Sequence, residues 1–195
     1  MKLSLPNVIS FIRILISPFV LILIVSDDPE LVCISFILYC TAAITDYLDG
    51  YLARRFGAVT TFGKFFDPLA DKFLTAAAFI GFVILNIVPL WMVAIVLIRD
   101  FGTTYLRVKA DNTGKPLVTS YSAKLKTFAQ MTYILFLYLL IFLKNISINS
   151  FWGINFDLII FSNYTYYLML GLTILSIWTA LQYIFPKKNI KSVQV

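Results

Sequence analysis

Long apolar runs restrict most strongly what this chain can fold into. A helix needs roughly 20 residues to cross a hydrocarbon layer ~30 Å thick at ~1.5 Å rise per residue. The sequence lacks the period-two alternation that strands of a membrane β-barrel require. Continuous apolar runs instead occupy residues 8–25, 31–44, 65–85, 90–109, 120–143 and 164–185. We therefore predict an all-α, polytopic membrane protein built as a bundle of six transmembrane helices.

Composition points the same way and excludes several kinds of site. Of the 195 residues, 60% are hydrophobic and 13% are charged, whereas a soluble domain is about 25% charged. We expect residues 1–195 to form a single membrane domain. Histidine is absent, which excludes Ser–His–Asp triads and His-ligated metal sites. Cys33 and Cys40 lie in an apolar run, and we interpret them as buried thiols rather than a disulfide.

Charge asymmetry predicts the orientation of the bundle. Because Lys and Arg concentrate in cytoplasmic loops, we expect both termini to be cytoplasmic in a multi-pass protein of the cytoplasmic membrane. We attribute the net charge of +6 to this topology and to anionic lipid rather than to nucleic acid. The opposite side carries mainly acids, with Lys144 as its cation. The cations on the predicted cytoplasmic side are Lys2, Arg54, Arg55, Lys64, Arg107, Lys109, Lys115, Lys124, Lys126, Lys187, Lys188 and Lys191.

One segment concentrates charge inside this apolar chain. Residues 45–72, TDYLDGYLARRFGAVTTFGKFFDPLADK, hold four aspartates. Asp46 and Asp49 are three residues apart, and Asp67 and Asp71 are four apart, so each pair shares one face of a helix. If the two helices run antiparallel, both pairs converge near the cytoplasmic boundary. Carboxylates so close together repel each other strongly in a low dielectric, unless cations neutralise them.

The types of donor in this segment predict a hard cation. Oxygen ligands without histidine favour Mg²⁺ or Mn²⁺ over zinc, and two such ions ~3.5–4 Å apart commonly clamp a phosphoryl or pyrophosphoryl group. Gly50, Ala53 and Gly63 leave room for a bulky ligand, and Arg54 offers a planar cation to phosphate oxygens. A solvated acidic helix face is the plain alternative, but intramembrane carboxylates are costly and are functional by default. The segment therefore predicts a metal-assisted site for a phosphorylated substrate.

The spacing resembles, without gap or substitution, the signature of the CDP-alcohol phosphotransferase family. Members of that family displace CMP from a CDP-linked substrate with an alcohol. The resemblance implies six transmembrane helices, a homodimer and a site that opens to the cytoplasm. The matching pattern is Asp46-x2-Asp49-Gly50-x2-Ala53-Arg54-x8-Gly63-x3-Asp67-x3-Asp71.

The resemblance also implies roles for these residues. The metal would be two ions of Mg²⁺ or Mn²⁺, held by Asp46, Asp49, Asp67 and Asp71. Asp71 would also be the general base. The positions that would contact the CDP-linked lipid are Asp46, Asp49, Gly50, Ala53, Arg54 and Gly63.

Further segments resemble the branch of this family that joins CDP-diacylglycerol to sn-glycerol 3-phosphate. They are LPNVISFIRI, IRDFGTTYLR, SAKLKTFAQM and WTALQYI. That branch more often has Arg-Glu where this chain has Arg99-Asp100. An Arg-Asp pair occurs in a related branch whose acceptor is phosphatidylglycerol. Phosphatidylglycerol and an inositol phosphate are therefore the alternative acceptors.

The acceptor's phosphate needs cations of its own. Arg107, Lys124 and Lys126 form a basic group on the predicted cytoplasmic side that suits this phosphate, and Arg99 is either a further ligand or a partner of Asp100 that shapes the cavity. The alternative is that these cations only set topology or contact anionic lipid headgroups. A cation transporter is the hypothesis from another class. Its site should lie near the midplane on interrupted helices, whereas the aspartates are predicted at the boundary.

Overall fold

The computed structural model describes residues 5–56, 61–113, 121–146 and 155–184, with side chains described at residues 10–45, 69–110, 113, 121–146 and 155–183. Within these ranges all regular structure is α-helical, which confirms the predicted fold class at this level. The helices are α1 (Leu5–Ile24), α2 (Pro29–Phe56), α3 (Thr61–Ile84), α4 (Leu90–Asn112), α5 (Tyr121–Asn145), α7 (Phe156–Ile160) and α8 (Asn163–Ile184).

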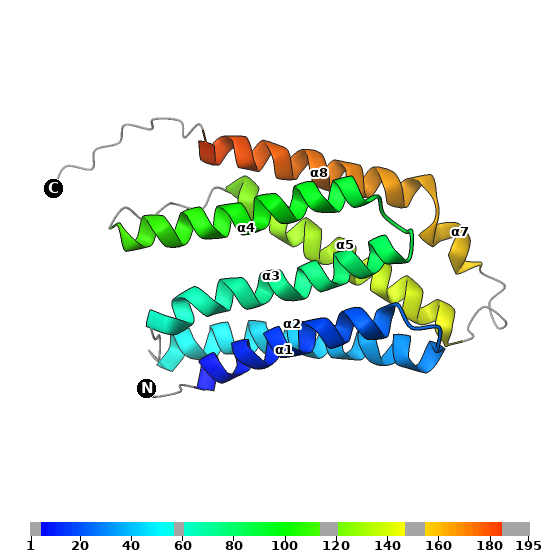
Figure 1. Cartoon of the computed structure of the whole chain (residues 1–195), viewed down its shortest axis with the longest axis horizontal. Coiled ribbons are helices and arrows are strands. Elements are labelled where there is room, and N and C mark those ends of the chain that lie inside the picture. The colour runs from blue at the N-terminus through cyan, green and yellow to red at the C-terminus, as the bar shows by residue number, and fades with distance from the viewer. Residues whose placement is uncertain (1–4, 57–60, 114–120, 147–154, 185–195) are drawn as a thin grey trace.

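The long helices form a bundle in which successive helices run in alternating directions (Figure 1). α1 packs against α2 and α3, and α4 lies between α3 and α8. α5 crosses the bundle obliquely and contacts α2, α3, α7 and α8. The ends of α2, α4 and α8 therefore lie at the same end of the bundle as the starts of α3 and α5.

The helices on both sides of the charged segment extend beyond the apolar runs. α2 continues to Phe56, and α3 already begins at Thr61. Away from its ends, a helix satisfies its backbone hydrogen bonds internally, so a charged stretch can continue a helix that an apolar run began. The predicted three- and four-residue spacings of the aspartates are thus carried by helical backbone.

α3 ends in a Schellman motif. Asn86 has a φ of 57°, in the left-handed region that Asn tolerates better than most residues. The Ile87 N–H donates to the Phe82 carbonyl at 2.9 Å, and the Asn86 N–H donates to the Val83 carbonyl at 2.9 Å. These bonds satisfy carbonyls that the helix end would leave without donors. The predicted break between the third and fourth apolar runs is confirmed.

The short helix α7 is not predicted by the apolar runs. The Asn155 side chain caps it by accepting a hydrogen bond from the Asp157 N–H at 3.1 Å. Phe156 and Ile160 of α7 are buried, and Lys144 on α5 pairs with Asp157 across 2.6 Å. Helices this short are marginal alone, so α7 depends on tertiary contacts that a sequence pattern does not contain.

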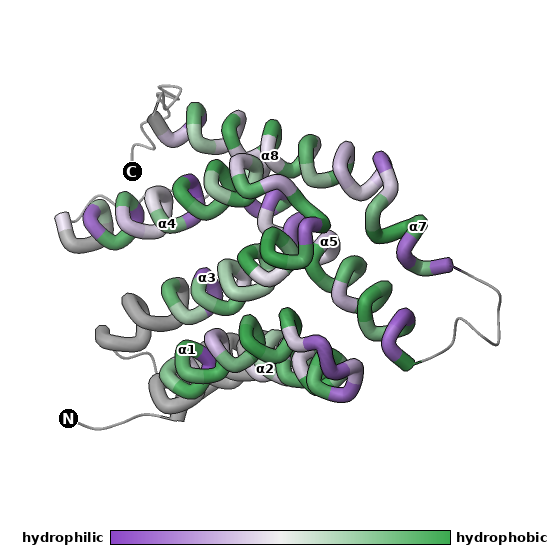
Figure 2. Tube along the Cα trace, turned by 45° about the vertical axis from the view of Figure 1, so that its right-hand side comes forward, coloured by the Kyte–Doolittle hydropathy of each residue, from purple (hydrophilic) through white to green (hydrophobic). Residues whose placement is uncertain are grey.

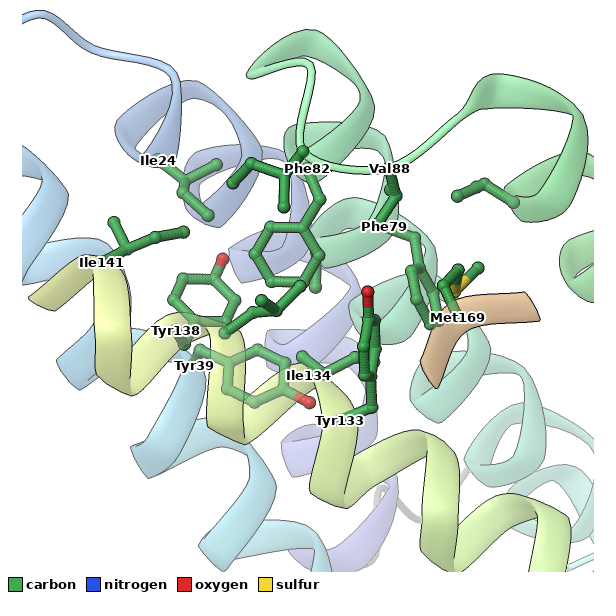
Figure 3. Close-up of a cluster of buried hydrophobic side chains, with 14 of the residues drawn as sticks. Ile24, Tyr39, Phe79, Phe82, Val88, Tyr133, Ile134, Tyr138, Ile141 and Met169 are labelled. Atoms are coloured by element: carbon green, nitrogen blue, oxygen red, sulfur yellow. The ribbon is translucent and has the colours of Figure 1, made fainter. Parts of the chain in front are cut away.

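The core takes buried side chains from α1, α2, α3, α4, α5, α7 and α8, and aromatic rings from α2, α3 and α5 pack together within it (Figure 3). Phe79 and Phe82 on α3 are fully buried. Phe82 meets Tyr138 of α5 with ring centroids 5.3 Å apart, and Tyr138 stacks on Tyr39 of α2 at 4.8 Å. Both distances fall in the range that aromatic pairs prefer. The cluster fixes α3 against α5 and thereby positions the helix that carries two of the predicted metal ligands.

α1 and α3 approach each other closely at Gly81. A Cβ added there would lie 2.6 Å from Cγ2 of Ile24, which is itself fully buried. We expect Gly81→Ala to reduce stability by ~1–3 kcal/mol, because overpacking strains rotamers and backbone. Thermal unfolding in detergent measures this effect.

Gly171→Ala is the matched control for that substitution. An added Cβ meets nothing within 4 Å at Gly171, and Ala favours a helix by ~1 kcal/mol over Gly. We expect this variant to unfold at the wild-type temperature or above. An unchanged midpoint for Gly81→Ala would contradict the close approach of α1 and α3.

The outer surface is strongly apolar. Large side chains such as Ile98, Phe128 and Trp178 are exposed, and Figure 2 shows hydrophobic residues along much of the helices. Apolar surface of this extent marks contact with a membrane or a partner. Among the described residues, Tyr121–Asn145 and Phe156–Tyr183 are long and apolar enough to cross a membrane. The count of six spans stays a prediction.

Candidate active site

The four predicted metal ligands lie on α2 and α3, and the end of α2 and the start of α3 lie at the same end of the bundle (Figure 1). Asp46 and Asp49 belong to α2, and Asp67 and Asp71 belong to α3. Asp71 alone among them has a described side chain. The roles of the others stay predictions, because the side chains outside the described set include those of Asp46, Asp49, Gly50, Ala53, Arg54, Gly63 and Asp67.

Among the side chains that the structure describes, no three His, Cys, Asp or Glu residues gather closely enough to hold a metal ion. Most of the predicted ligands lie outside that set. The fit to a metal therefore rests on the chemistry of the donors. Carboxylates at helical spacing on two neighbouring helices suit a hard divalent cation.

Asp71 is half-buried and ion-paired. Its carboxylate lies 3.1 Å from the ammonium group of Lys72. Asp71 also lines a mainly apolar cavity of about 380 Å³, whose walls include Leu74, Met131, Leu135 and the buried Arg13. A carboxylate in such surroundings is partly screened from bulk water and can face a substrate in the cavity. We call this space the apolar cavity.

A second cavity, of about 430 Å³, is lined by cations from three helices. Lys72 comes from α3, Arg99 and Arg107 from α4, and Lys124 from α5. No acidic side chain is present among the described residues that line it. Like charges held together repel one another, and an anion bound between them removes that repulsion. We call this space the basic cavity.

The two cavities adjoin each other. Met131 lines both, while the ion-paired neighbours Asp71 and Lys72 line one cavity each. A small anion held in the basic cavity would therefore lie close to the Asp71–Lys72 pair. This arrangement suits activation of a hydroxyl group on a small, negatively charged molecule.

A buried network of charges holds Arg99. Its Nη1 donates a hydrogen bond to Oδ1 of Asp100 at 3.0 Å. Lys126 donates from Nζ to the same oxygen and to Oε1 of Gln130. Asp100, Lys126 and Gln130 are almost completely buried. Removing one partner of such a pair leaves an uncompensated buried charge, which typically lowers the free energy of unfolding by ~3–5 kcal/mol.

The structure separates Lys126 from the other predicted acceptor ligands. Arg99, Arg107 and Lys124 line the basic cavity, whereas the ammonium group of Lys126 is buried against Asp100 and Gln130. Helix geometry explains this difference. Residues two apart on a helix do not face the same way, so Lys124 and Lys126 cannot both point into one cavity.

Lys72 and Tyr183 line the basic cavity but are not among the predicted ligands. Lys72 directly follows Asp71, and this adjacency to a predicted ligand is a signal that could have found it. Tyr183 on α8 lines the cavity as well. Nothing local in the sequence links Tyr183 to α4, because the packing of α8 on α4 is a tertiary contact.

Comparison with known proteins assigns the class. The family model for CDP-alcohol phosphatidyltransferase matches residues 3–180, which is most of the chain. The chain belongs to the CDP-alcohol phosphatidyltransferase family and is a transferase of that class. This result confirms the family that the aspartate signature resembles.

Individual relatives carry a more specific name. A Bacillus subtilis (strain 168) protein called CDP-diacylglycerol–glycerol-3-phosphate 3-phosphatidyltransferase is 39% identical over 140 residues, covering 66% of this chain and 72% of the relative. A Rickettsia typhi protein of the same name is 35% identical over 128 residues, covering 66% of this chain and 72% of the relative. A protein of the same name from Salmonella choleraesuis is 33% identical over 137 residues, covering 67% of this chain and 74% of the relative. These names agree with the branch that the other segments resemble.

Proposed function

We propose that this chain transfers the phosphatidyl group of CDP-diacylglycerol to a hydroxyl of sn-glycerol 3-phosphate. The reaction forms phosphatidylglycerophosphate and releases CMP. The observation that carries the proposal is the basic cavity next to Asp71, where four cations from three helices line the space beside one carboxylate. The names of the relatives support the same pair of substrates.

The basic cavity suits a phosphomonoester acceptor. Arg99 and Arg107 offer planar guanidinium groups, which match phosphate oxygens better than a point charge does, and Lys72 and Lys124 add further positive charge. Glycerol 3-phosphate is small enough for a cavity of about 430 Å³. For Lys126 we propose a supporting role, because it reaches Arg99 only through Asp100.

Asp71 takes the chemical role in this proposal. It accepts the proton from the acceptor hydroxyl as that oxygen attacks the phosphorus atom of the diacylglycerol phosphate, and the bond to CMP breaks. The apolar cavity around Asp71, with Leu74 and Leu135 in its wall, suits the lipid part of the donor, so the two substrates would meet at this carboxylate.

The aspartates of α2 and α3 would hold two divalent cations, either Mg²⁺ or Mn²⁺. When bound, such ions neutralise the pyrophosphate and make CMP a better leaving group. Arg54 would lie close to the nucleotide phosphates, and Gly50, Ala53 and Gly63 would leave room for the nucleotide. The metal positions in this proposal are Asp46, Asp49, Asp67 and Asp71.

The apolar surface supports a multi-pass placement in the cytoplasmic membrane. We propose six spans, with both termini and the active site facing the cytoplasm, where water-soluble glycerol 3-phosphate is available. The N-terminal end of α1 and the C-terminal end of α8 lie at the same end of the bundle as the starts of α3 and α5 (Figure 1), as this topology requires. A homodimer remains part of the proposal through the family resemblance.

An acceptor comparison tests the function. Protein purified in detergent is given CDP-diacylglycerol and Mg²⁺, together with glycerol 3-phosphate, phosphatidylglycerol or an inositol phosphate in separate reactions. We expect CMP release and phosphatidylglycerophosphate, identified by mass spectrometry, with glycerol 3-phosphate alone. Chelation with EDTA should stop the reaction, and added Mg²⁺ or Mn²⁺ should restore it.

The other outcomes identify the alternatives. Release of CMP with phosphatidylglycerol alone would contradict the proposal and make the product cardiolipin. Release with inositol phosphate alone would assign that acceptor. Absence of release with every acceptor would contradict the donor assignment. A cation transporter is disfavoured by the basic cavity, because Lys72, Arg99, Arg107 and Lys124 would repel a permeating cation.

A further inference from the structure

Tyr183 joins the two arginines of the basic cavity. Its hydroxyl oxygen accepts a hydrogen bond from Nη2 of Arg107 at 3.1 Å. The guanidinium carbon of Arg99 lies 5.9 Å from the centroid of the Tyr183 ring, within the distance at which a cation is attracted to an aromatic face. Tyr183 also lines the basic cavity itself. One side chain of α8 therefore contacts both planar cations of α4.

Such a contact favours one arrangement of the two arginine side chains. They are eight residues apart on α4, just over two turns, so they leave the same face about 12 Å apart along the axis. Both side chains are long and flexible, and their like charges favour separation. Arg99 is already held from one side, through its hydrogen bond to Asp100. For Arg107, the hydroxyl of Tyr183 is the hydrogen-bond partner that the structure gives.

We propose that Tyr183 is a positioning residue for the acceptor. It orients Arg99 and Arg107 toward a common anion before that anion binds, so the phosphate does not have to organise two mobile side chains. The proposal rests on the assignment of the basic cavity to the phosphate of glycerol 3-phosphate. If Tyr183 acts in this way, the affinity for glycerol 3-phosphate depends on α8, although α8 carries none of the predicted site residues.

Two substitutions separate the contributions of the hydroxyl and the ring. Tyr183→Phe removes the hydrogen bond to Arg107 and keeps the aromatic face beside Arg99. We expect it to raise the KM for glycerol 3-phosphate about tenfold, the size expected for one hydrogen bond to a charged group. Tyr183→Leu removes both contacts, and we expect a larger increase. In both variants the KM for CDP-diacylglycerol should stay close to the wild-type value.

A binding measurement independent of turnover completes the test. Calorimetric titration of the full-length protein with glycerol 3-phosphate, without the CDP-lipid, should show the same order of weakening, from wild type to Tyr183→Phe to Tyr183→Leu. Tyr167→Phe is the matched control, because Tyr167 lies on the same helix, is 64% exposed and is absent from the cavity lining. Its affinity should equal that of the wild type.

Each result has a distinct meaning. Equal increases of KM for both substrates, or unchanged binding in Tyr183→Phe and Tyr183→Leu, would overturn the positioning role. A wild-type protein that neither binds nor uses glycerol 3-phosphate would overturn the proposed function instead. If Tyr183→Leu unfolds at a much lower temperature, Tyr183→Phe, which keeps the ring and its packing, decides the question alone.

Discussion

Asp71→Asn is expected to abolish CMP release while leaving the fold intact. Asparagine keeps the shape of the side chain but cannot accept the proton from the acceptor hydroxyl, and loss of a general base alone typically costs about 10²–10⁴-fold in rate. Because Asp71 is also a proposed metal ligand, the measured loss should reach at least the upper part of that range. The measurement is kcat at saturating CDP-diacylglycerol and glycerol 3-phosphate.

The control for this variant is Asp157→Asn. Asp157 also pairs with a lysine, Lys144, but it does so on α7, away from the proposed site, and its side chain is 44% exposed. Exposed ion pairs contribute only ~0–1 kcal/mol, so activity and unfolding temperature should hardly change.

Calorimetric binding of glycerol 3-phosphate should persist in Asp71→Asn, because Asp71 does not line the basic cavity. Turnover at a rate near that of the wild type would refute the assignment of the base.

Arg107→Gln is expected to give the largest loss of acceptor affinity. The substitution removes a guanidinium group from the basic cavity and also removes the hydrogen bond to Tyr183. A hydrogen bond to a charged group contributes ~1.5–3 kcal/mol, so the KM for glycerol 3-phosphate should rise about 10–100-fold. The KM for CDP-diacylglycerol should change little. The effect should exceed that of Tyr183→Phe, which leaves the guanidinium group in place.

Lys109→Gln is the matched control for Arg107→Gln. It removes one positive charge from the same helix, but Lys109 is exposed and does not line the cavity. A general loss of positive charge would affect both variants alike, whereas a specific phosphate contact would affect only Arg107→Gln. If both variants raise the acceptor KM equally, Arg107 acts only through the overall electrostatic field.

Much of the fold could be predicted from local sequence properties. Runs of apolar residues predict the long helices and the break at Asn86, because helix length and helix termination depend on neighbouring residues. α7 could not be predicted in this way, since its five residues are held as a helix by the Asn155 cap and by the burial of Phe156 and Ile160. The spacing of the aspartates along the chain is also a local property, and α2 and α3 keep it as helical spacing. The family that this spacing resembles is the one that the comparisons confirm.

The candidate acceptor site could not be predicted fully from local sequence properties. Loop charge places Arg107, Lys124 and Lys126 on one side of the bundle, and that grouping treats Lys124 and Lys126 as equivalent. On α5 they point in different directions, so Lys124 lines the basic cavity and Lys126 is buried against Asp100. Charge counting has no information about the direction of a side chain, which depends on helix phase and on the neighbouring helix.

The sequence by itself therefore determined the all-α class, the positions of the long helices, the family and the spacing of the four aspartates. Each of these follows from residues that are close together in the chain. The meeting of Lys72, Arg99, Arg107, Lys124 and Tyr183 around one cavity depends on how α3, α4, α5 and α8 pack. Residues as far apart as Arg107 and Tyr183 meet only when those helices are held against the aromatic core, and no local pattern encodes that arrangement.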